Sequence, residues 1–310
     1  MNVNVIKPIS YCYGVKRAID MVTEIAKENQ DKKLYCLGKI VNNNDVVNQL
    51  KELNIITLDV KPSEYFKTLE QIEENSIVFF SAHGHDKKLE ELLKEKNIEF
   101  YSTTCPIITK MEETVISFLH DGYTIIFIGV KNHPETEAFI SLDKNIIVFD
   151  VVSDNFINLP ASLSDKVVVF NQSTLSDELL EKPLKKIREI SPNVKLKTEF
   201  CNTTKTRNIL LINSKVANSD LVLIIGSHSS SNCTRLFEKA TSLYPTKTII
   251  FVENLNNLKN YGISHYTNAS VLSGTSTPMS TIESIVNYLH IIWLIHCRRN
   301  AMNVITINNV

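Results

Sequence analysis

The sequence predicts an α/β protein made of three similar lobes, each built on a parallel sheet. Cys12, Cys105 and Cys201 are separated by 93 and 96 residues in a chain of 310 residues. Each cysteine follows an extended stretch and precedes a helix-like segment with basic residues. The closing glycine of an apolar strand then follows 26, 24 and 25 residues later. Because these features recur in register, we interpret the chain as three copies of one unit of about 95 residues.

Within each copy, two apolar strands flank an amphipathic helical pattern. The first strands end at a glycine and are Leu34–Gly38, Ile125–Gly129 and Leu221–Gly226. The second strands run into small polar loops, which are Ser81–Gly84, Asn171–Thr174 and Ser273–Pro278. Helical patterns include Lys87–Lys96 and Leu179–Ile190. Such alternation indicates parallel sheets, whose carboxyl ends are where open α/β sheets bind ligands.

This repeat divides the chain into a first lobe over 13–104, a second over 105–200 and a third over 201–288. The N-terminal segment 1–12 alternates as a strand at Val3 and Val5, and we expect it to complete the third lobe. A pseudo-threefold arrangement of the lobes would bring the three cysteines to one centre. The divergent tail, 289–310, follows. Its apolar run Tyr288–Ile295 is shorter than the ~20 residues of a membrane span, so a docked helix or strand is expected rather than a membrane-touching tail.

Charge and targeting signals narrow the class of protein. Lys and Arg total 33 against 34 Asp and Glu, which leaves a formal net charge of −1 and argues against a nucleic-acid partner. The N-terminus has no apolar segment typical of a secretory signal. We therefore expect a cytoplasmic monomer without a membrane span, in a compartment where thiols stay reduced and serve as ligands rather than as bridges.

Three converging thiolates suit an iron–sulfur cluster or a zinc ion. Zinc sites with several sulfurs usually use paired Cys-x-x-Cys motifs, which this sequence lacks, and the compact ferredoxin motifs are absent too. Three thiolates on a four-iron cluster would leave one open iron, which can act as a Lewis acid and electron donor. The remaining cysteines, Cys36, Cys233 and Cys297, are expected to be structural.

Several motifs, taken together, carry a family resemblance. They are Tyr11–Ile19, Ser81–Gly84, Thr104–Lys110, His133–Glu135 and Gly226–Asn232. In this order, from about Asn4 to Tyr288, the chain resembles the 4-hydroxy-3-methylbut-2-enyl diphosphate reductase (IspH/LytB) family. The resemblance implies a three-lobed fold around a [4Fe–4S] cluster held by Cys12, Cys105 and Cys201, with one open iron and conversion to [3Fe–4S] on oxidation. It also implies reductive removal of the substrate hydroxyl, giving isopentenyl and dimethylallyl diphosphate in the last step of the non-mevalonate isoprenoid pathway. Ferredoxin or flavodoxin would supply the electrons.

The same resemblance identifies the site residues. Glu135 matches the catalytic glutamate, and a carboxylic acid in a dry site is a fitting proton donor to a departing hydroxyl. Glu137 is expected to be solvated. The substrate-binding residues are Asn42, His83, His133, Ser173, Ser230, Ser231, Asn232 and Ser276, with Thr174 and Thr204 in supporting positions. The segment Ser230–Asn232 opens a helical pattern, so it suits either anion binding or ordinary N-capping.

The sequence departs from the family pattern at a few positions. Asn42 stands where the family has a histidine, so we expect roughly tenfold weaker diphosphate binding. Glu112 also stands where a histidine is common, Ser102 replaces Asp and Ala138 replaces Gly. These departures leave open a non-catalytic or impaired diphosphate-binding or iron-sensing homologue. A zinc-dependent hydrolase is disfavoured because its His and Glu ligand motif is missing.

Overall fold

The structure is a computed structural model that describes residues 1–198 and 201–307, with side chains up to residue 295. The chain forms two compact units. One combines Met1–Cys12 with Thr203–Val310, and we call it the terminal unit. The other is continuous, Tyr13–Asn202, and we call it the central unit. Each unit is described by itself below.

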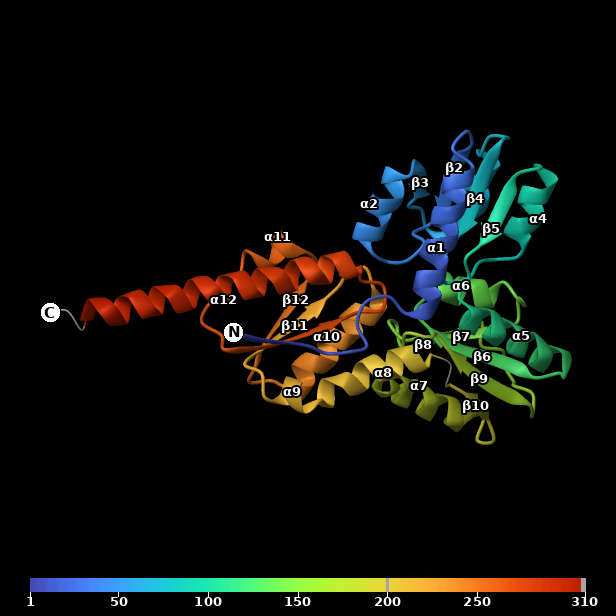
Figure 1. Ribbon diagram of the computed structural model, residues 1–310. Coiled ribbons are helices and arrows are strands. Elements are labelled where there is room, and N and C mark those ends of the chain that lie inside the picture. The colour runs from blue at the N-terminus through green and yellow to red at the C-terminus, as the bar shows by residue number, and fades with distance from the viewer. Residues whose placement is uncertain (199–200, 308–310) are drawn as a thin grey trace. The chain divides into compact units, whose positions relative to one another are not determined.

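The central unit contains two sheets (Figure 1). The first has the strand order β3-β2-β4-β5 and consists of β2 (Lys33–Leu37), β3 (Ile55–Leu58), β4 (Ser76–Phe80) and β5 (Glu99–Ser102). The second has the order β10-β9-β6-β7-β8 and consists of β6 (Thr124–Gly129), β7 (Ile147–Asp150), β8 (Asn155–Ile157), β9 (Val167–Asn171) and β10 (Lys195–Lys197). All neighbours are parallel except β7 and β8.

The terminal unit contains one parallel sheet in the order β1-β13-β11-β12. Its strands are β1 (Asn2–Val5), β11 (Leu221–Ile225), β12 (Thr248–Val252) and β13 (Asn268–Ser273). The predicted strand at Val3 and Val5 is present, and it pairs with β13. The boundaries proposed for the three lobes and their pseudo-threefold arrangement stay predictions.

The three sheets share one topology. In each, the first strand (β2, β6 or β11) has the next strand in the chain on one side and a later strand on the other. The strand order therefore reverses direction between β2 and β4, between β6 and β9, and between β11 and β13. Loops after such strands diverge and leave a crevice at the carboxyl edge, where ligands bind in open α/β sheets. The predicted α/β class with parallel sheets is confirmed.

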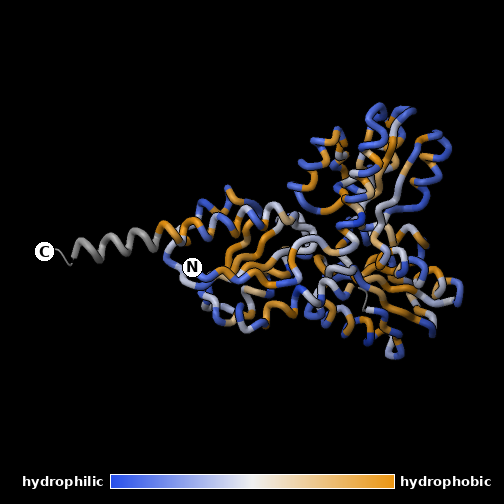
Figure 2. Tube along the Cα trace, in the orientation of Figure 1, coloured by the Kyte–Doolittle hydropathy of each residue, from blue (hydrophilic) through white to orange (hydrophobic). Residues whose placement is uncertain are grey.

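Helices cover these sheets and are α1 (Tyr13–Glu28), α2 (Asn44–Glu52), α3 (Tyr65–Glu70), α4 (Lys88–Glu95), α5 (Pro106–His120), α6 (Pro134–Ile140), α7 (Asp177–Ile190), α8 (Asn202–Ile209), α9 (Ser214–Ala217), α10 (Ser231–Leu243), α11 (Leu255–Leu258) and α12 (Met279–Ile307), with short 3₁₀ turns at Pro62–Glu64 and Leu210–Ile212. Figure 2 shows the strands as mostly hydrophobic and the helices as mixed. In the second sheet, for example, Phe127, Phe139 and Phe170 are fully buried in one core cluster. The apolar face of α6 is thus buried against β6 and β9.

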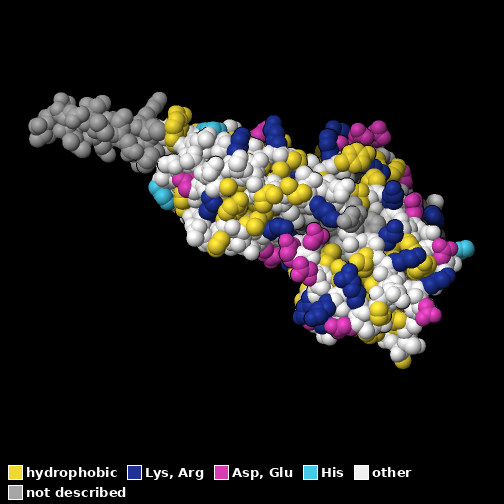
Figure 3. Space-filling view, turned by 90° about the horizontal axis from the view of Figure 1, so that it is seen from below, with side chains coloured by type: hydrophobic (Ala, Val, Ile, Leu, Met, Phe, Trp, Pro, Cys, Tyr) yellow, Lys and Arg dark blue, Asp and Glu magenta, His cyan; other side chains and the backbone are white. Residues whose placement is uncertain are grey.

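The positions of the cysteines match the sequence prediction. Cys12, Cys105 and Cys201 immediately precede α1, α5 and α8, respectively. Cys36 in β2 and Cys233 in α10 are fully buried, as expected for structural residues, while the side chain of Cys297 lies outside the described residues. Figure 3 shows basic and acidic side chains interspersed on the drawn face, in keeping with the formal net charge of −1.

The tail of the chain is helical. Helix α12 docks through Ile282, Ile285 and Leu289, which are buried in the core of the terminal unit. The apolar run beyond them leaves the core, since Trp293 and Leu294 are 41% and 52% exposed. The expectation of a docked helix therefore holds for the first half of the predicted run and not for its end. No helix among the described residues is both long and apolar enough to cross a membrane.

Candidate functional site

The predicted site residues lie on the loops at the three crevices described above. In the central unit, Asn42 and His83 follow β2 and β4, while His133, Glu135 and Ser173 follow β6 and β9. Because β2 neighbours β4 and β6 neighbours β9, the loops of each pair lie side by side. The topology thus explains why residues far apart in sequence meet at one edge of a sheet.

Glu135 is held by Ser173. The Glu135 side chain is fully buried in the first turn of α6. The Ser173 backbone N–H donates to its Oε1 at 2.6 Å, and the Ser173 hydroxyl donates to its Oε2 at 2.8 Å. Burial raises the pKa of Glu135 to about 7, although both bonds from Ser173 favour the ionised form. A carboxyl group with this pKa can hold a proton near neutral pH and also release it.

His133 is oriented by the same helix. It is the N-cap of α6, and its Nδ1 accepts a hydrogen bond from the Glu135 backbone N–H at 3.2 Å. An accepting Nδ1 puts the proton of the neutral ring on Nε2. Burial lowers the pKa of His133 to about 3, so the ring is neutral. Its buried Nε2 has no hydrogen-bond partner among the described residues. This N–H is therefore a donor available to a ligand.

His83 and Asn42 extend this donor group. The rings of His83 and His133 meet edge to face, with centroids 5.3 Å apart. Burial lowers the pKa of His83 to about 4. The amide nitrogen of Asn42 donates to Nε2 of His83 at 3.3 Å. Asn42 thus lies beside His83 and contributes a neutral amide, while its predicted contact with the diphosphate stays a prediction.

In the terminal unit, hydroxyl and amide groups gather at the start of α10. Ser230 is its N-cap, and the Ser276 hydroxyl donates to Oγ of Ser230 at 3.3 Å. Asn232 donates to the hydroxyl of Thr204 at 3.3 Å and accepts from the Thr275 N–H at 3.2 Å. Thr204 therefore orients Asn232, which matches its predicted supporting position. Ser231 is half-buried in the first turn. The N-capping interpretation of this segment is confirmed, and anion binding stays a prediction, since an N-capped helix start also offers N–H groups to an anion.

Thr174 and Glu137 have structural partners. Thr174 accepts a hydrogen bond from the Gln172 side-chain amide at 2.9 Å, so it stabilises the loop that carries Ser173. Glu137 is half-buried rather than fully solvated, and its Oε1 accepts from the Asn132 N–H at 3.0 Å.

The three predicted metal ligands are all half-buried, at or just before the first turn of a helix. Cys105 is the N-cap of α5, and a Cβ atom built on Gly14 would lie 2.5 Å from its sulfur. Only glycine therefore allows the start of α1 to approach this thiol. Among the described residues, no three His, Cys, Asp or Glu side chains form a group that could hold one metal ion.

Sequence reasoning missed two buried charged groups. Arg207, in α8, is 2% exposed and donates hydrogen bonds to the carbonyl oxygens of Pro8 and Ser10. Burial lowers its pKa, whereas the nearby Cys12 and Cys233 thiols raise it, so the Arg207 cation favours a thiolate at Cys12. Glu112, in α5, is 5% exposed. The sequence identified Glu112 only as a departure from the family pattern, and no local signal marks either residue as buried.

Comparison with known proteins defines the family. The family model described as "LytB protein" matches residues 3–290, which is nearly the whole chain. The chain belongs to the LytB family. The end of the match lies close to Tyr288, where the sequence resemblance ends. The LytB family relatives include proteins named 4-hydroxy-3-methylbut-2-enyl diphosphate reductase. One, from Malacoplasma penetrans, is 31% identical and covers 93% of this chain and 97% of its own length. Another, from Bacillus subtilis, is 29% identical over 93% of this chain and 90% of its own length.

Solved structures show the same LytB family fold. The E-1-hydroxy-2-methyl-but-2-enyl-4-diphosphate reductase from Plasmodium falciparum has a TM-score of 0.80 and 26% identity, covering 93% of this chain and 87% of its own. A second structure, that of (E)-4-hydroxy-3-methyl-but-2-enyl diphosphate reductase, has a TM-score of 0.69 and 27% identity. The match covers 94% of this chain and 99% of the other. That enzyme is described as the terminal enzyme of the non-mevalonate pathway.

Proposed function

We propose that this protein is a reductase that converts (E)-4-hydroxy-3-methylbut-2-enyl diphosphate into isopentenyl and dimethylallyl diphosphate. The reaction breaks the allylic C–O bond, consumes two electrons and two protons, and releases water. The observation that carries the proposal is the buried Glu135 carboxyl group, held by Ser173 beside a buried His133 N–H whose acceptor would come from a ligand. The names of the family relatives support this function over the non-catalytic alternative.

We assign the cofactor to Cys12, Cys105 and Cys201. The residues fit a cluster because all three thiols adjoin a helix N-terminus, Gly14 leaves room beside the Cys105 sulfur, and Arg207 lies near Cys12. Three thiolates on different irons do not need to lie within reach of a single ion. A bound [4Fe–4S] cluster with one open iron would supply electrons and Lewis acidity to the substrate hydroxyl, and oxidation would convert it to [3Fe–4S].

Glu135 acts as the proton donor to the departing hydroxyl. With a pKa of about 7, half of the Glu135 groups carry a proton at neutral pH. When the C–O bond breaks, that proton goes to the hydroxyl oxygen, and water leaves instead of hydroxide. The carboxylate that remains is held by the two Ser173 hydrogen bonds, which strengthen when the group becomes charged.

Neutral donors bind the diphosphate. The Nε2–H of His133 is preorganised by its Nδ1 bond to the α6 backbone, and Asn42 contributes an amide beside His83. In the terminal unit, Ser230, Ser231, Asn232 and Ser276 offer hydroxyl, amide and helix-terminus donors. Because these neutral groups donate hydrogen bonds to the diphosphate, its negative charge can be bound without an excess of basic residues. The sequence has no such excess, since its formal net charge is −1.

The remaining assignments follow from the same proposal. We assign the electrons to a ferredoxin or flavodoxin, the compartment to the cytoplasm, and the oligomeric state to a monomer.

The test is anaerobic purification and reconstitution, followed by absorption spectroscopy and turnover with reduced methyl viologen. We expect a brown protein that converts the substrate. Replacement of Glu135 by Gln keeps the geometry of the side chain but removes its acid, so we expect an intact cluster and turnover reduced by about 10²-fold or more. A colourless protein with stoichiometric zinc would contradict the proposal. A brown protein that binds substrate without turnover would favour the sensor alternative.

A further inference from the structure

The buried carboxyl group of Glu112 has no role in the mechanism above. Glu112 lies in α5 and is 5% exposed. Its Oε1 atom is buried and has no hydrogen-bond partner among the described residues. A carboxyl oxygen in this state is costly unless the group is protonated or meets a water or ligand. This position therefore needs a chemical explanation.

The surroundings of Glu112 connect it with the site. A Cβ atom built on Gly84 would lie 3.0 Å from Oε1 of Glu112 and 3.1 Å from Cβ of Ala138. The Glu112 carboxyl thus lies between the loop that carries His83 and helix α6, where Ala138 is one turn from Glu135. Glu112 is also close enough to Glu135 to raise the pKa of that carboxyl by charge repulsion.

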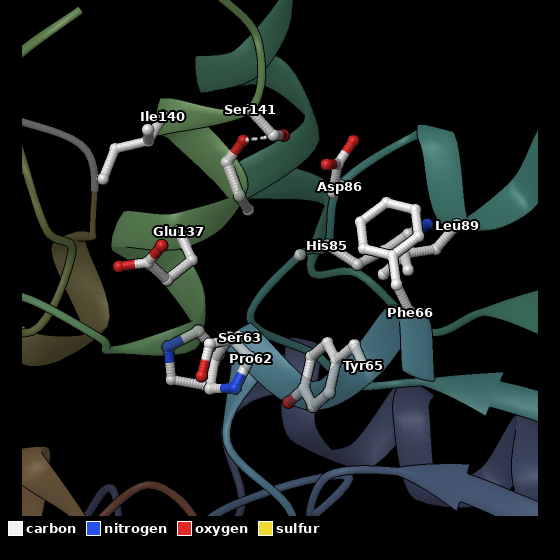
Figure 4. A pocket seen from close by; sticks show the side chains of 13 residues that line it. Pro62, Ser63, Tyr65, Phe66, His85, Asp86, Leu89, Glu137, Ile140 and Ser141 are labelled. Carbon is white, nitrogen blue, oxygen red and sulfur yellow. Dashed lines mark hydrogen bonds between the residues drawn. The ribbon is translucent and has the colours of Figure 1, made fainter. Parts of the chain in front are cut away.

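A pocket adjoins the same residues. A cavity of about 240 Å³ is lined by Gly84, His85 and Ala138, together with residues of α3, α4 and α6. Figure 4 shows this pocket, with Ser63 and Phe66 on one side and Glu137 and Ser141 on another. Ser63 and Phe66 are exposed, so the pocket is in contact with solvent.

His85 in the pocket wall is also incompletely paired. Its Nε2 lies 2.8 Å from Oε1 of Glu90, and its ring stacks on Phe80 with centroids 3.7 Å apart. The buried Nδ1 of His85 has no hydrogen-bond partner among the described residues. His85 thus brings a buried, unpaired polar atom to the pocket wall, and Oε1 of Glu112 lies behind Gly84 of the same wall. Water in the pocket can pair with such atoms.

We propose that Glu112 is a positioning residue that resupplies the proton of Glu135 from water in this pocket. After a turnover Glu135 is a carboxylate. The O–H bond of protonated Glu112 breaks, its proton forms a new O–H bond on Glu135, directly or through a water, and Glu112 regains a proton from solvent in the pocket. No electrons move in this step. The inference rests on the proposed function, because only a proton-consuming reaction needs the resupply.

The acid strengths of the two groups suit this transfer. Burial raises the pKa of Glu112 to about 7, which matches that of Glu135, so the transfer between them is nearly isoenergetic. Several charged or titratable groups face Glu112 and act on its charge. They are Lys87, Glu90, Glu113 and Glu135, with His85 in the adjoining pocket wall. A histidine at this position could carry the same proton.

The test compares single-turnover and steady-state kinetics of the reconstituted enzyme in Glu112→Gln and Glu112→His. The first turnover uses the proton already on Glu135, so its rate should be unchanged in Glu112→Gln. Later turnovers need resupply, so kcat should fall about tenfold or more while KM and iron content stay the same. Glu112→His should restore kcat. Glu181→Gln, at an exposed position on α7, is the control and should behave as wild type.

A second readout does not depend on activity. In the oxidised resting enzyme, the infrared band of protonated carboxyl groups should contain two components that titrate near pH 7, one from Glu112 and one from Glu135. In Glu112→Gln the first component should be absent. The Glu135 component should titrate at lower pH than in wild type, because the charge repulsion from Glu112 is removed. Equal kcat in wild type and Glu112→Gln would overturn this inference but not the proposed function. The same holds if Glu112→Gln and Glu112→His lose kcat to the same extent at unchanged iron content. An inactive, cluster-loaded wild type would overturn the proposed function as well.

Discussion

Replacing Glu135 with Gln should make the protein more stable while it abolishes turnover. The pKa of Glu135 is raised from 4.5 to about 7 in the folded protein. Between these two pH values the folded state binds more protons than the unfolded state, so the wild type loses stability as the pH rises, and the loss is complete above pH ~7. Gln fills the same space and has no charge to bury, so the variant avoids this loss.

The magnitude follows from the size of the shift. One pKa unit corresponds to about 1.36 kcal/mol, so the full shift corresponds to about 3 kcal/mol. Part of the loss has already occurred at pH 5. We therefore expect the stability advantage of Glu135→Gln to grow by about 2–3 kcal/mol between pH 5 and pH 8.

The assay is urea unfolding followed by circular dichroism at both pH values. The only tryptophan, Trp293, lies in the terminal unit, so its fluorescence would not follow the central unit in which Glu135 lies. Glu113→Gln is the control, because water already solvates that exposed carboxylate. If the advantage of Glu135→Gln were the same at pH 5 and pH 8, burial of the Glu135 charge would not be costly, and our account of its raised pKa would be wrong.

Two further substitutions test other parts of the site. Gly14→Ala would put a Cβ atom 2.5 Å from the Cys105 sulfur, so we expect at least half of the iron and acid-labile sulfide to be lost on reconstitution. Gly262→Ala is the control and should keep both, because no atom lies within 4 Å of its Cβ position. Equal iron content in the two variants would show that crowding at Cys105 does not affect the cluster. Asn42→His should lower KM by up to about tenfold if a charged donor replaces the amide beside His83, and an unchanged KM would remove Asn42 from the diphosphate contacts.

The fold and much of the site followed from local patterns. The apolar strands ending at Gly38, Gly129 and Gly226 were predictable because parallel strands buried on both faces give continuous apolar runs. Gly38 has φ +72°, a backbone conformation that favours glycine directly after a strand. Ser173 and Glu135 were assigned to the site from the family resemblance, and the strand order, which the sequence did not predict, makes their loops neighbours.

Other features depend on contacts that the sequence does not encode locally. Glu112 lies in an amphipathic helix where a charged residue normally faces water, and it is buried because the loop at Gly84 and helix α6 pack over it. The role of His133 as the N-cap of α6 also depends on the backbone conformation at the start of that helix. The apolar run Tyr288–Ile295 was expected to dock as a helix or strand, but Trp293 and Leu294 at its end lie outside the core into which Leu289 packs.

The pairing of β1 with β13 has a consequence for biosynthesis. Asn2 of β1 lies opposite Asn268 of β13, so β1 cannot pair until β13, far later in the chain, has been synthesised. The central unit, by contrast, is continuous over Tyr13–Asn202 and can fold as soon as it has emerged. During that interval the segment Met1–Cys12 remains without its sheet. The proposed ligand Cys12 therefore reaches its final surroundings late, and loading of the cluster becomes a step that follows the synthesis of β13.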